Sequence, residues 1–214
     1  MTTGLKNFSD AGFCTGKQAW NKKGMVTIMK IGYALTGSFC TVSKSLEVLK
    51  GLTSDYEVIP IVSPAVFGTD TRFAKAEETI KALTEICGIP PVNNIKDAEP
   101  FGPSVKLDAL IISPCTGNTL AKLANGITDT SVTMAAKAHL RNDRPLIIAL
   151  ATNDGLSQNL KNIAALLTRK SVFFVPFGQD SPVSKPHSLV CDFKKIPETL
   201  DMALAGVQLQ PLLN

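Results

Sequence analysis

One segment of the chain, residues 107–129, combines a buried strand, a polar turn and the start of a helix. It reads LDALIISPCTGNTLAKLANGITD. The apolar run over 107–112 predicts a strand of a parallel sheet, because such strands are covered on both faces. Pro114 is expected to end this strand. Leu120, Leu123 and Ile127 recur at helical spacing, so a helix follows the turn.

The turn between this strand and this helix is rich in small and hydrogen-bonding side chains. A helix start offers unpaired N–H groups and the positive end of the helix dipole, which together attract anions. Taken alone, the turn is explained better by an ordinary loop with a Thr or Asn helix cap. The candidate ligand-binding residues here are Ser113, Cys115, Thr116, Gly117, Asn118 and Thr119.

A second unit of the same kind occurs near residue 30, and it strengthens the case for an anion site. Residues 30–35 predict a strand, Thr36-Gly37-Ser38 a polar turn, and residues 40–50 a helix. Gly37 permits a tight turn and a close approach by a ligand. The turn is neither the GxGxxG of dinucleotide-binding proteins nor a Walker A loop.

Strands and helices continue to alternate to the end of the chain. Apolar runs predict strands over 56–62, 145–151 and 171–176. Helical patterns cover 72–86, 129–139, 158–167 and 196–204. Residues 88–104 are expected to form a loop or short edge elements, and residues 177–188 a polar loop. Mostly apolar strands joined by helices predict an α/β domain with a parallel sheet covered on both faces.

Polar turns follow several of these strands, and in a parallel sheet such turns meet at one edge. They are Thr36–Ser38, Ser63, residues 113–119 and residues 152–154. Open α/β sheets bind ligands beyond the carboxyl ends of their strands, at a point where the strand order reverses. The sequence therefore predicts one polar, glycine-lined cleft at this edge.

Composition excludes several classes of function. The net charge of +4 is dispersed, so nucleic acid is not expected as a partner. The five cysteines form no CxxC pair, so neither a metal site nor a disulfide framework is expected, and a reducing cytoplasm fits. No apolar stretch approaches the ~20 residues of a membrane span.

Few side chains in the predicted cleft are able to exchange protons. His139 and His187 are both expected at the surface, and Cys115 is expected to be a small buried residue rather than a reactive thiol. A cleft rich in N–H and O–H donors but poor in titratable groups indicates that a cofactor carries the chemistry.

Residues 1–28 are polar and show no sustained period, so we expect a poorly ordered extension before a domain over 29–214. They hold no apolar run like that of a signal peptide, and Met25 and Met29 are both plausible start sites.

The motifs together resemble a family. SPCTGNTLAKLANGITD resembles the "PASANT" loop and helix of the FMN-binding flavoproteins that include the homo-oligomeric cysteine decarboxylases. Thr36-Gly37-Ser38 resembles their first phosphate loop, and Ala151-Thr152-Asn153 falls where they carry a substrate-facing Asn. The resemblance covers the chain from about residue 30 to residue 213.

This resemblance implies a three-layer α/β/α sandwich with a Rossmann/flavodoxin-like sheet, a homo-oligomer, and FMN as the cofactor. The FMN phosphate would be held by Gly37, Ser38, Ser63 and the 113–119 loop. Thr152 and Asn153 would meet a substrate carboxylate.

Further motifs narrow the resemblance to members that act as one half of a two-component synthase. These motifs are ALTGSFCT, TDTRF, AEPFGP, RNDRP, ATND and FFVPFGQD. The implied reaction oxidises a cyclic dicarboxylate from the lysine pathway to an aromatic pyridine dicarboxylate. The implied partner is a second, NAD(P)-binding protein of the synthase, and the implied setting is the mother-cell cytoplasm of a sporulating bacterium.

Two alternatives stay open. The first is a non-catalytic protein that binds FMN or phosphate and shapes its partner. The second is a flavin-dependent decarboxylase. The family's decarboxylases carry a His upstream of the central strand, where this chain has AEPFGP, and a Met and a Trp after the Asn that are absent after Asn153.

Overall fold

A seven-stranded sheet forms the centre of the computed structural model, which describes residues 18–20 and 26–214. Its strands lie in the order β4-β3-β5-β6-β9-β8, and β7 also pairs with β6. The strands are β3 (Lys30–Leu35), β4 (Glu57–Val62), β5 (Ala109–Cys115), β6 (Leu146–Thr152), β7 (Val172–Phe174), β8 (Phe177–Ser181) and β9 (Lys185–Cys191).

The strands from β3 to β7 are parallel to one another and make up the predicted parallel sheet. Across the sheet they run β4-β3-β5-β6-β7, which is the flavodoxin-like order. The direction of winding reverses between β3 and β5, because the chain moves from β3 outward to β4 and then back past β3 to β5. All of β5 is buried, as its apolar sequence predicts.

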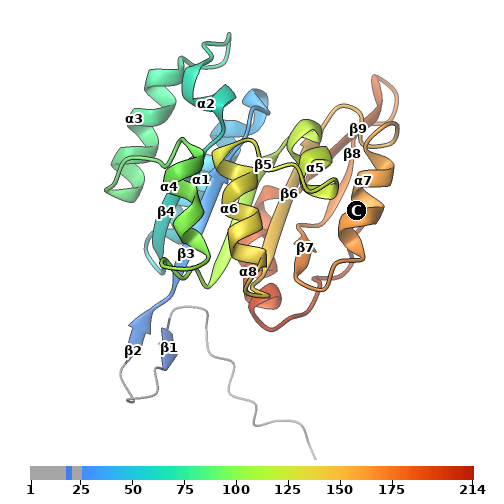
Figure 1. The fold of residues 1–214 in the computed structure, drawn as a ribbon. Coiled ribbons are helices and arrows are strands. Elements are labelled where there is room, and N and C mark those ends of the chain that lie inside the picture. The colour runs from blue at the N-terminus through green and yellow to red at the C-terminus, as the bar shows by residue number, and fades with distance from the viewer. Residues whose placement is uncertain (1–17, 21–25) are drawn as a thin grey trace, which may run out of the picture.

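Helices cover both faces of the sheet, so the three-layer α/β/α sandwich is confirmed. Figure 1 shows α4, α5, α6 and α7 on the side that faces the viewer, while α1 and α8 pack against each other on the opposite face. The helices are α1 (Val42–Leu52), α2 (Pro64–Gly68), α3 (Ala76–Cys87), α4 (Ile95–Ala98), α5 (Gly117–Ala124), α6 (Ser131–Leu140), α7 (Leu160–Leu167) and α8 (Ile196–Leu204). Short 3-10 helices span Phe39–Thr41, Glu99–Phe101 and Phe193–Lys195.

The segment 177–188, predicted as a polar loop, is instead mostly a β-hairpin. Strands β8 and β9 pair antiparallel, and β9 pairs antiparallel with the end of β6 through Ala151 and Thr152. The tip of the hairpin is exposed, so its residues carry no continuous apolar run that would signal a strand. The sheet is therefore mixed rather than wholly parallel.

Pro114 does not end the central strand, contrary to the prediction. It lies within β5, and the register between β5 and β6 shifts between Ile112 and Cys115. The shift lets the strand continue past a residue that has no N–H to donate.

The predicted N-terminal extension lies largely outside the described residues. Its described parts, β1 (Gln18–Trp20) and β2 (Val26–Ile28), pair antiparallel. The division of the chain at residue 28 stays a proposal.

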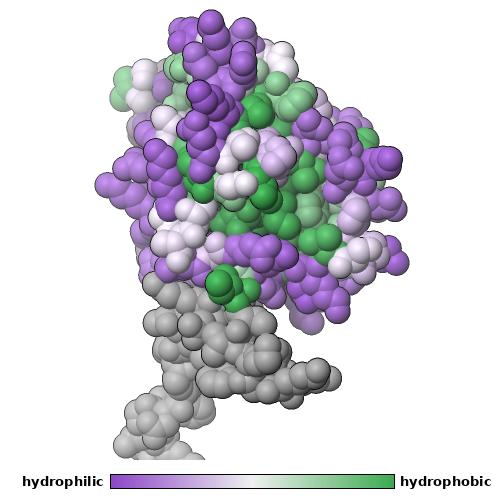
Figure 2. All heavy atoms as spheres, turned by 90° about the vertical axis from the view of Figure 1, so that its left-hand side faces the viewer, coloured by the Kyte–Doolittle hydropathy of each residue, from purple (hydrophilic) through white to green (hydrophobic). Residues whose placement is uncertain are grey.

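The edge of the domain formed by β4 is partly covered. Val92 pairs with this edge: its carbonyl accepts from Val62 N–H, and its N–H donates to the Pro60 carbonyl. Figure 2 views the molecule from this side and shows apolar groups set among polar ones. Ile89, in the segment between α3 and α4, and Ile95, the first residue of α4, are exposed. In the part of the chain that the structure describes, no helix has the length and apolar character needed to cross a membrane.

Candidate functional site

A cleft of about 720 Å³ lies at the carboxyl edge of the sheet. Its walls come from the turn after β3, the start of α5, the segment after β6, the loop between α2 and α3, and the β8–β9 hairpin. The first two of these elements follow β3 and β5, between which the winding of the sheet reverses. The cleft therefore occupies the position at which open α/β sheets bind ligands.

Thr36 joins the two loops that flank this reversal. Its hydroxyl donates to the Pro114 carbonyl at 2.7 Å and accepts from the Thr116 N–H at 2.9 Å. The Thr36 N–H also points to the Pro114 carbonyl, at 3.3 Å. Thr36 is buried and does not line the cleft, so it fixes the spacing of the two loops from beneath.

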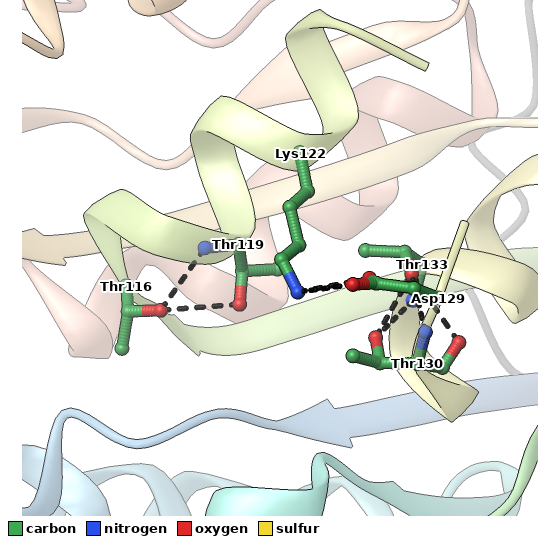
Figure 3. A network of polar contacts seen from close by, with 6 residues as sticks. All are labelled: Thr116, Thr119, Lys122, Asp129, Thr130 and Thr133. Atoms are coloured by element: carbon green, nitrogen blue, oxygen red, sulfur yellow. Dashed lines mark hydrogen bonds and ion pairs between the residues drawn. The ribbon is translucent and has the colours of Figure 1, made fainter. Parts of the chain in front are cut away.

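Thr116 is the N-cap of α5 and directs the start of this helix into the cleft. Its hydroxyl accepts from the Thr119 N–H at 3.2 Å and donates to the Thr119 hydroxyl at 3.1 Å (Figure 3). Gly117 and Asn118 then occupy the first two helical positions, where N–H groups have no acceptor within the helix. These N–H groups and the helix dipole favour an anion at this end of the cleft.

The far end of α5 is tied to α6 through the loop between them. Lys122 Nζ lies 2.8 Å from both carboxylate oxygens of Asp129 (Figure 3). This hydrogen bond lowers the pKa of Asp129. Thr130 and Thr133 form a capping box that starts α6. The helix that points at the cleft is thus held at both ends.

The structure divides the predicted binding residues into two groups. Gly37, Ser38, Thr116, Gly117 and Asn118 line the cleft, as do the predicted substrate residues Thr152 and Asn153. The other predicted residues are buried, and they do not line it: Thr36, Ser63, Ser113, Cys115 and Thr119.

Ser63 and Ser113 have structural partners instead. Ser63 is the N-cap of α2 and accepts from the Val66 N–H at 3.4 Å. Ser113 hydrogen-bonds Ser45 on α1 at 2.9 Å, and Ser45 in turn bonds the Tyr33 hydroxyl at 2.9 Å. Burial raises the pKa of Tyr33 to about 12. These contacts anchor α1 beneath the cleft.

A polar cluster lies against Gly117. Thr152 donates its hydroxyl to Asp154, and Asn159 Nδ2 lies 2.9 and 2.8 Å from the two oxygens of the same carboxylate. A Cβ at Gly117 would meet the side-chain atoms of Thr152, Asn159 and Asp154 at 2.4–2.6 Å. Glycine is required here because α5 starts in contact with this cluster.

Sequence reasoning missed three cations that line the cleft, namely Lys44, Arg72 and Lys185. Lys185 pairs with Asp180 at 2.5 Å, and this bond raises the pKa of Lys185. Arg72 stacks over the Phe73 ring, with its guanidinium carbon 4.8 Å from the ring centroid. The available signal was the position of Lys44, in the first turn of the helix that follows the Thr36–Ser38 loop. Arg72 and Lys185 required the tertiary fold.

The cysteine and the two histidines considered from the sequence, Cys115, His139 and His187, do not line the cleft. Cys115 is buried, as predicted, and burial raises the pKa of its thiol. His139, predicted at the surface, is instead fully buried, because α6 is buried on most of its surface. Its Nε2 lies 2.9 Å from the Pro145 carbonyl, and burial lowers its pKa to about 4. His187 is exposed, as predicted.

No group of three or more His, Cys, Asp or Glu side chains is placed to hold a metal within residues 18–20 and 26–214.

Comparison with known proteins identifies the family. A family model described as Flavoprotein matches residues 20–204, which is most of the chain. This chain belongs to the flavoprotein family. The B subunit of dipicolinate synthase from Bacillus subtilis (strain 168) is similar to this flavoprotein, with 43% identity over 185 residues that cover 86% of this chain and 92% of the relative.

A solved structure supports the similarity to the dipicolinate synthase B subunits. The crystal structure of the dipicolinate synthase B subunit from Bacillus halodurans C matches the flavoprotein with a TM-score of 0.80 and 43% identity, over 87% of this chain and 96% of that one. Within its family, the flavoprotein therefore groups with the dipicolinate synthase B subunits, and the resemblance read from its motifs is confirmed.

A more distant structure shows the fold alone. A dodecameric FMN-dependent UbiX-like decarboxylase from Escherichia coli O157:H7 matches with a TM-score of 0.60 and 22% identity, over 84% of this chain and 96% of that one.

Proposed function

We propose that this flavoprotein binds FMN in the cleft and acts with the A subunit of dipicolinate synthase to oxidise a dihydrodipicolinate-type intermediate to dipicolinic acid. The observation that carries the proposal is the pair of turns joined by Thr36, which bring the start of α5 and the Gly37–Ser38 turn to one cleft. The similarity to the Bacillus B subunits supports the same assignment.

The residues present fit FMN. The volume of about 720 Å³ lies within the ~300–1,000 Å³ typical of small-molecule sites. The N–H groups of Gly117 and Asn118 and the Ser38 hydroxyl offer donors to a phosphate at the start of α5. When bound, FMN would supply a hydride acceptor for oxidising the ring.

Asn153 is the candidate for direct contact with the substrate. It is exposed in the cleft, and its amide makes no hydrogen bond to any of the residues that the structure describes. The amide is therefore available to donate to a substrate carboxylate. The Thr152 hydroxyl is used by Asp154, so Thr152 positions this segment rather than offering a free donor.

The wider setting is part of the same proposal. The A subunit is the proposed partner, and the mother-cell cytoplasm of a sporulating bacterium is the proposed location. We also propose a homo-oligomer, with α5 and the segment after it at the contact between copies.

The experiment is a coupled assay with the A subunit, in which dipicolinate is measured with FMN-loaded and FMN-stripped protein. We expect output to fall on stripping and to return when FMN is added back. Asn118→Asp, which places a negative charge at the start of α5, should weaken FMN retention and lower output. Asn153→Ala should lower output while FMN is retained.

Two results would contradict the proposal. Output that is independent of FMN would favour the alternative of a non-catalytic protein that shapes its partner. Release of carbon dioxide without ring oxidation would favour a decarboxylase.

A further inference from the structure

The charged side chains that line the cleft differ in the partners that they already have within the protein. Asp154 accepts three hydrogen bonds from the neutral side chains of Thr152 and Asn159. Asp180 and Lys185 compensate each other. Lys44 and Arg72 form no ion pair with any residue in 18–20 or 26–214. Among these residues, the cleft therefore presents two cations without an ion-pair partner to whatever enters it.

Lys44 occupies a position that is unfavourable for helix stability. It lies in the first turn of α1, which contains no acidic residue. Acidic side chains are stabilising at a helix start, and a cation there is opposed by the positive end of the dipole. This arrangement becomes favourable when an anion binds between the helix start and the ammonium group.

The guanidinium of Arg72 is stacked on an aromatic ring. Its guanidinium lies over the Phe73 ring, and the Phe73 side chain is itself 52% exposed. Stacking restricts the orientation of the guanidinium while its N–H edge remains free. Such an edge matches a carboxylate through two parallel hydrogen bonds.

We propose that Lys44 and Arg72 form a two-point clamp for the two carboxylates of the ring substrate. This inference rests on the proposed function, because it names the residues that select a dicarboxylate within the same cleft. The clamp is separate from the donors assigned to the FMN phosphate, which are the start of α5 and the Ser38 hydroxyl. It distinguishes a ring with two carboxylates from a ring with one.

The test uses the FMN-loaded full chain and two probes, dipicolinate and picolinate. Dipicolinate carries both carboxylates of the proposed product, and picolinate carries one. We expect calorimetric titration to show tighter binding of dipicolinate. Arg72→Gln and Lys44→Gln should each weaken dipicolinate binding by roughly tenfold, and bring it close to picolinate binding. Lys185→Gln is the matched control and should change binding much less, because Lys185 is already paired.

FMN affinity, measured by fluorescence on the same variants, separates the clamp from the flavin site. We expect it to stay near wild type, since all three side chains are exposed and their removal leaves the fold intact. Loss of FMN in Arg72→Gln or Lys44→Gln would overturn the clamp, because these cations would then be holding the cofactor. Equal binding of the two probes by wild type would overturn it as well.

The same experiment distinguishes failure of FMN binding from failure of the clamp. If the wild-type protein never retains FMN, the same titration is made on the flavin-free protein. Preference for dipicolinate that is lost in Arg72→Gln would support the clamp without the flavin, and absence of that preference would overturn it.

Discussion

The hydroxyl of Thr36 accepts the backbone N–H of Thr116 across 2.9 Å, and so ties the turn after β3 to the N-cap of α5. The same hydroxyl donates to the Pro114 carbonyl at 2.7 Å. Both bonds are formed by one buried side chain at the point where the sheet reverses its winding. The geometry of the cleft floor therefore depends on a residue that the ligand need not touch.

Replacement of Thr36 by valine keeps the shape of the side chain and removes both bonds. The Thr116 N–H would lose its partner in a partly buried region, which costs about 1–3 kcal/mol. The Pro114 carbonyl would keep the backbone N–H of residue 36. We expect Thr36→Val to lower the free energy of unfolding by this amount and to weaken FMN binding. Thr36→Ser, which keeps the hydroxyl, should remain close to wild type in both. Equal behaviour of the two variants in chemical denaturation would show that the hydroxyl is not needed.

Gly117 is expected to tolerate no side chain. An added Cβ would lie 2.4–2.6 Å from three polar atoms of Thr152, Asn159 and Asp154, so α5 or the cluster must move. Gly117→Ala should destabilise the protein by about 1–3 kcal/mol and weaken FMN binding. Gly51→Ala is the control, because nothing lies within 4 Å of a Cβ there and Gly51 is in helix α1. That change should be neutral or stabilising by up to about 1 kcal/mol. A Gly117→Ala protein with wild-type stability and FMN affinity would contradict the close packing.

Buried His139 should make stability depend on pH. Burial lowers its pKa from 6.5 to about 4, so the unfolded chain binds the proton more readily than the folded protein does. The contribution of neutral His139 to the free energy of unfolding is fully present above about pH 6.5. It is lost as the pH falls toward 4, by about 3 kcal/mol in total. We expect His139→Gln to make the free energy of unfolding depend less on pH in this range, as measured by denaturant titrations at stepped pH. His187→Gln, at an exposed site, should keep the wild-type slope. An unchanged slope in His139→Gln would mean that other groups cause the loss.

The cysteines offer a probe of the cleft. Cys40 is exposed and lines it, whereas Cys115 and Cys191 are buried, and burial raises the pKa of both thiols. Burial also raises the pKa of Cys87, to about 11. We expect a maleimide at neutral pH to label Cys40 first, and bound FMN to slow this reaction. Cys14 lies outside the described residues, so the experiment is best made in a Cys14→Ser background. Labelling of Cys40 that is indifferent to FMN would place the flavin elsewhere.

Much of this fold follows from the local sequence. The apolar runs of β3, β5 and β6 are buried on both sides, so pattern alone indicates a parallel sheet. The small polar turns after these strands then predict where the cleft lies. The hairpin β8–β9 escaped prediction because its strands lie mostly at the exposed rim, and β9 joins the parallel strands only at the end of β6, through Ala151 and Thr152.

Individual side chains were less predictable than the elements. Ser63, Ser113 and Cys115 occupy strand ends, but each points into the protein, and no local signal separates these positions from Ser38 or Thr116. His139 was misplaced because a helix end is usually exposed, whereas α6 is buried on most of its surface. The cations at Arg72 and Lys185 reach the cleft only through tertiary contacts.

The most direct test of FMN binding in this cleft is an absorbance spectrum of the protein after incubation with FMN and desalting, for wild type and for Thr36→Val. We predict that wild type retains the flavin bands and that Thr36→Val retains markedly less. A wild-type protein that emerges colourless would contradict FMN binding. Equal retention by the two proteins would contradict its placement between the loops that Thr36 joins.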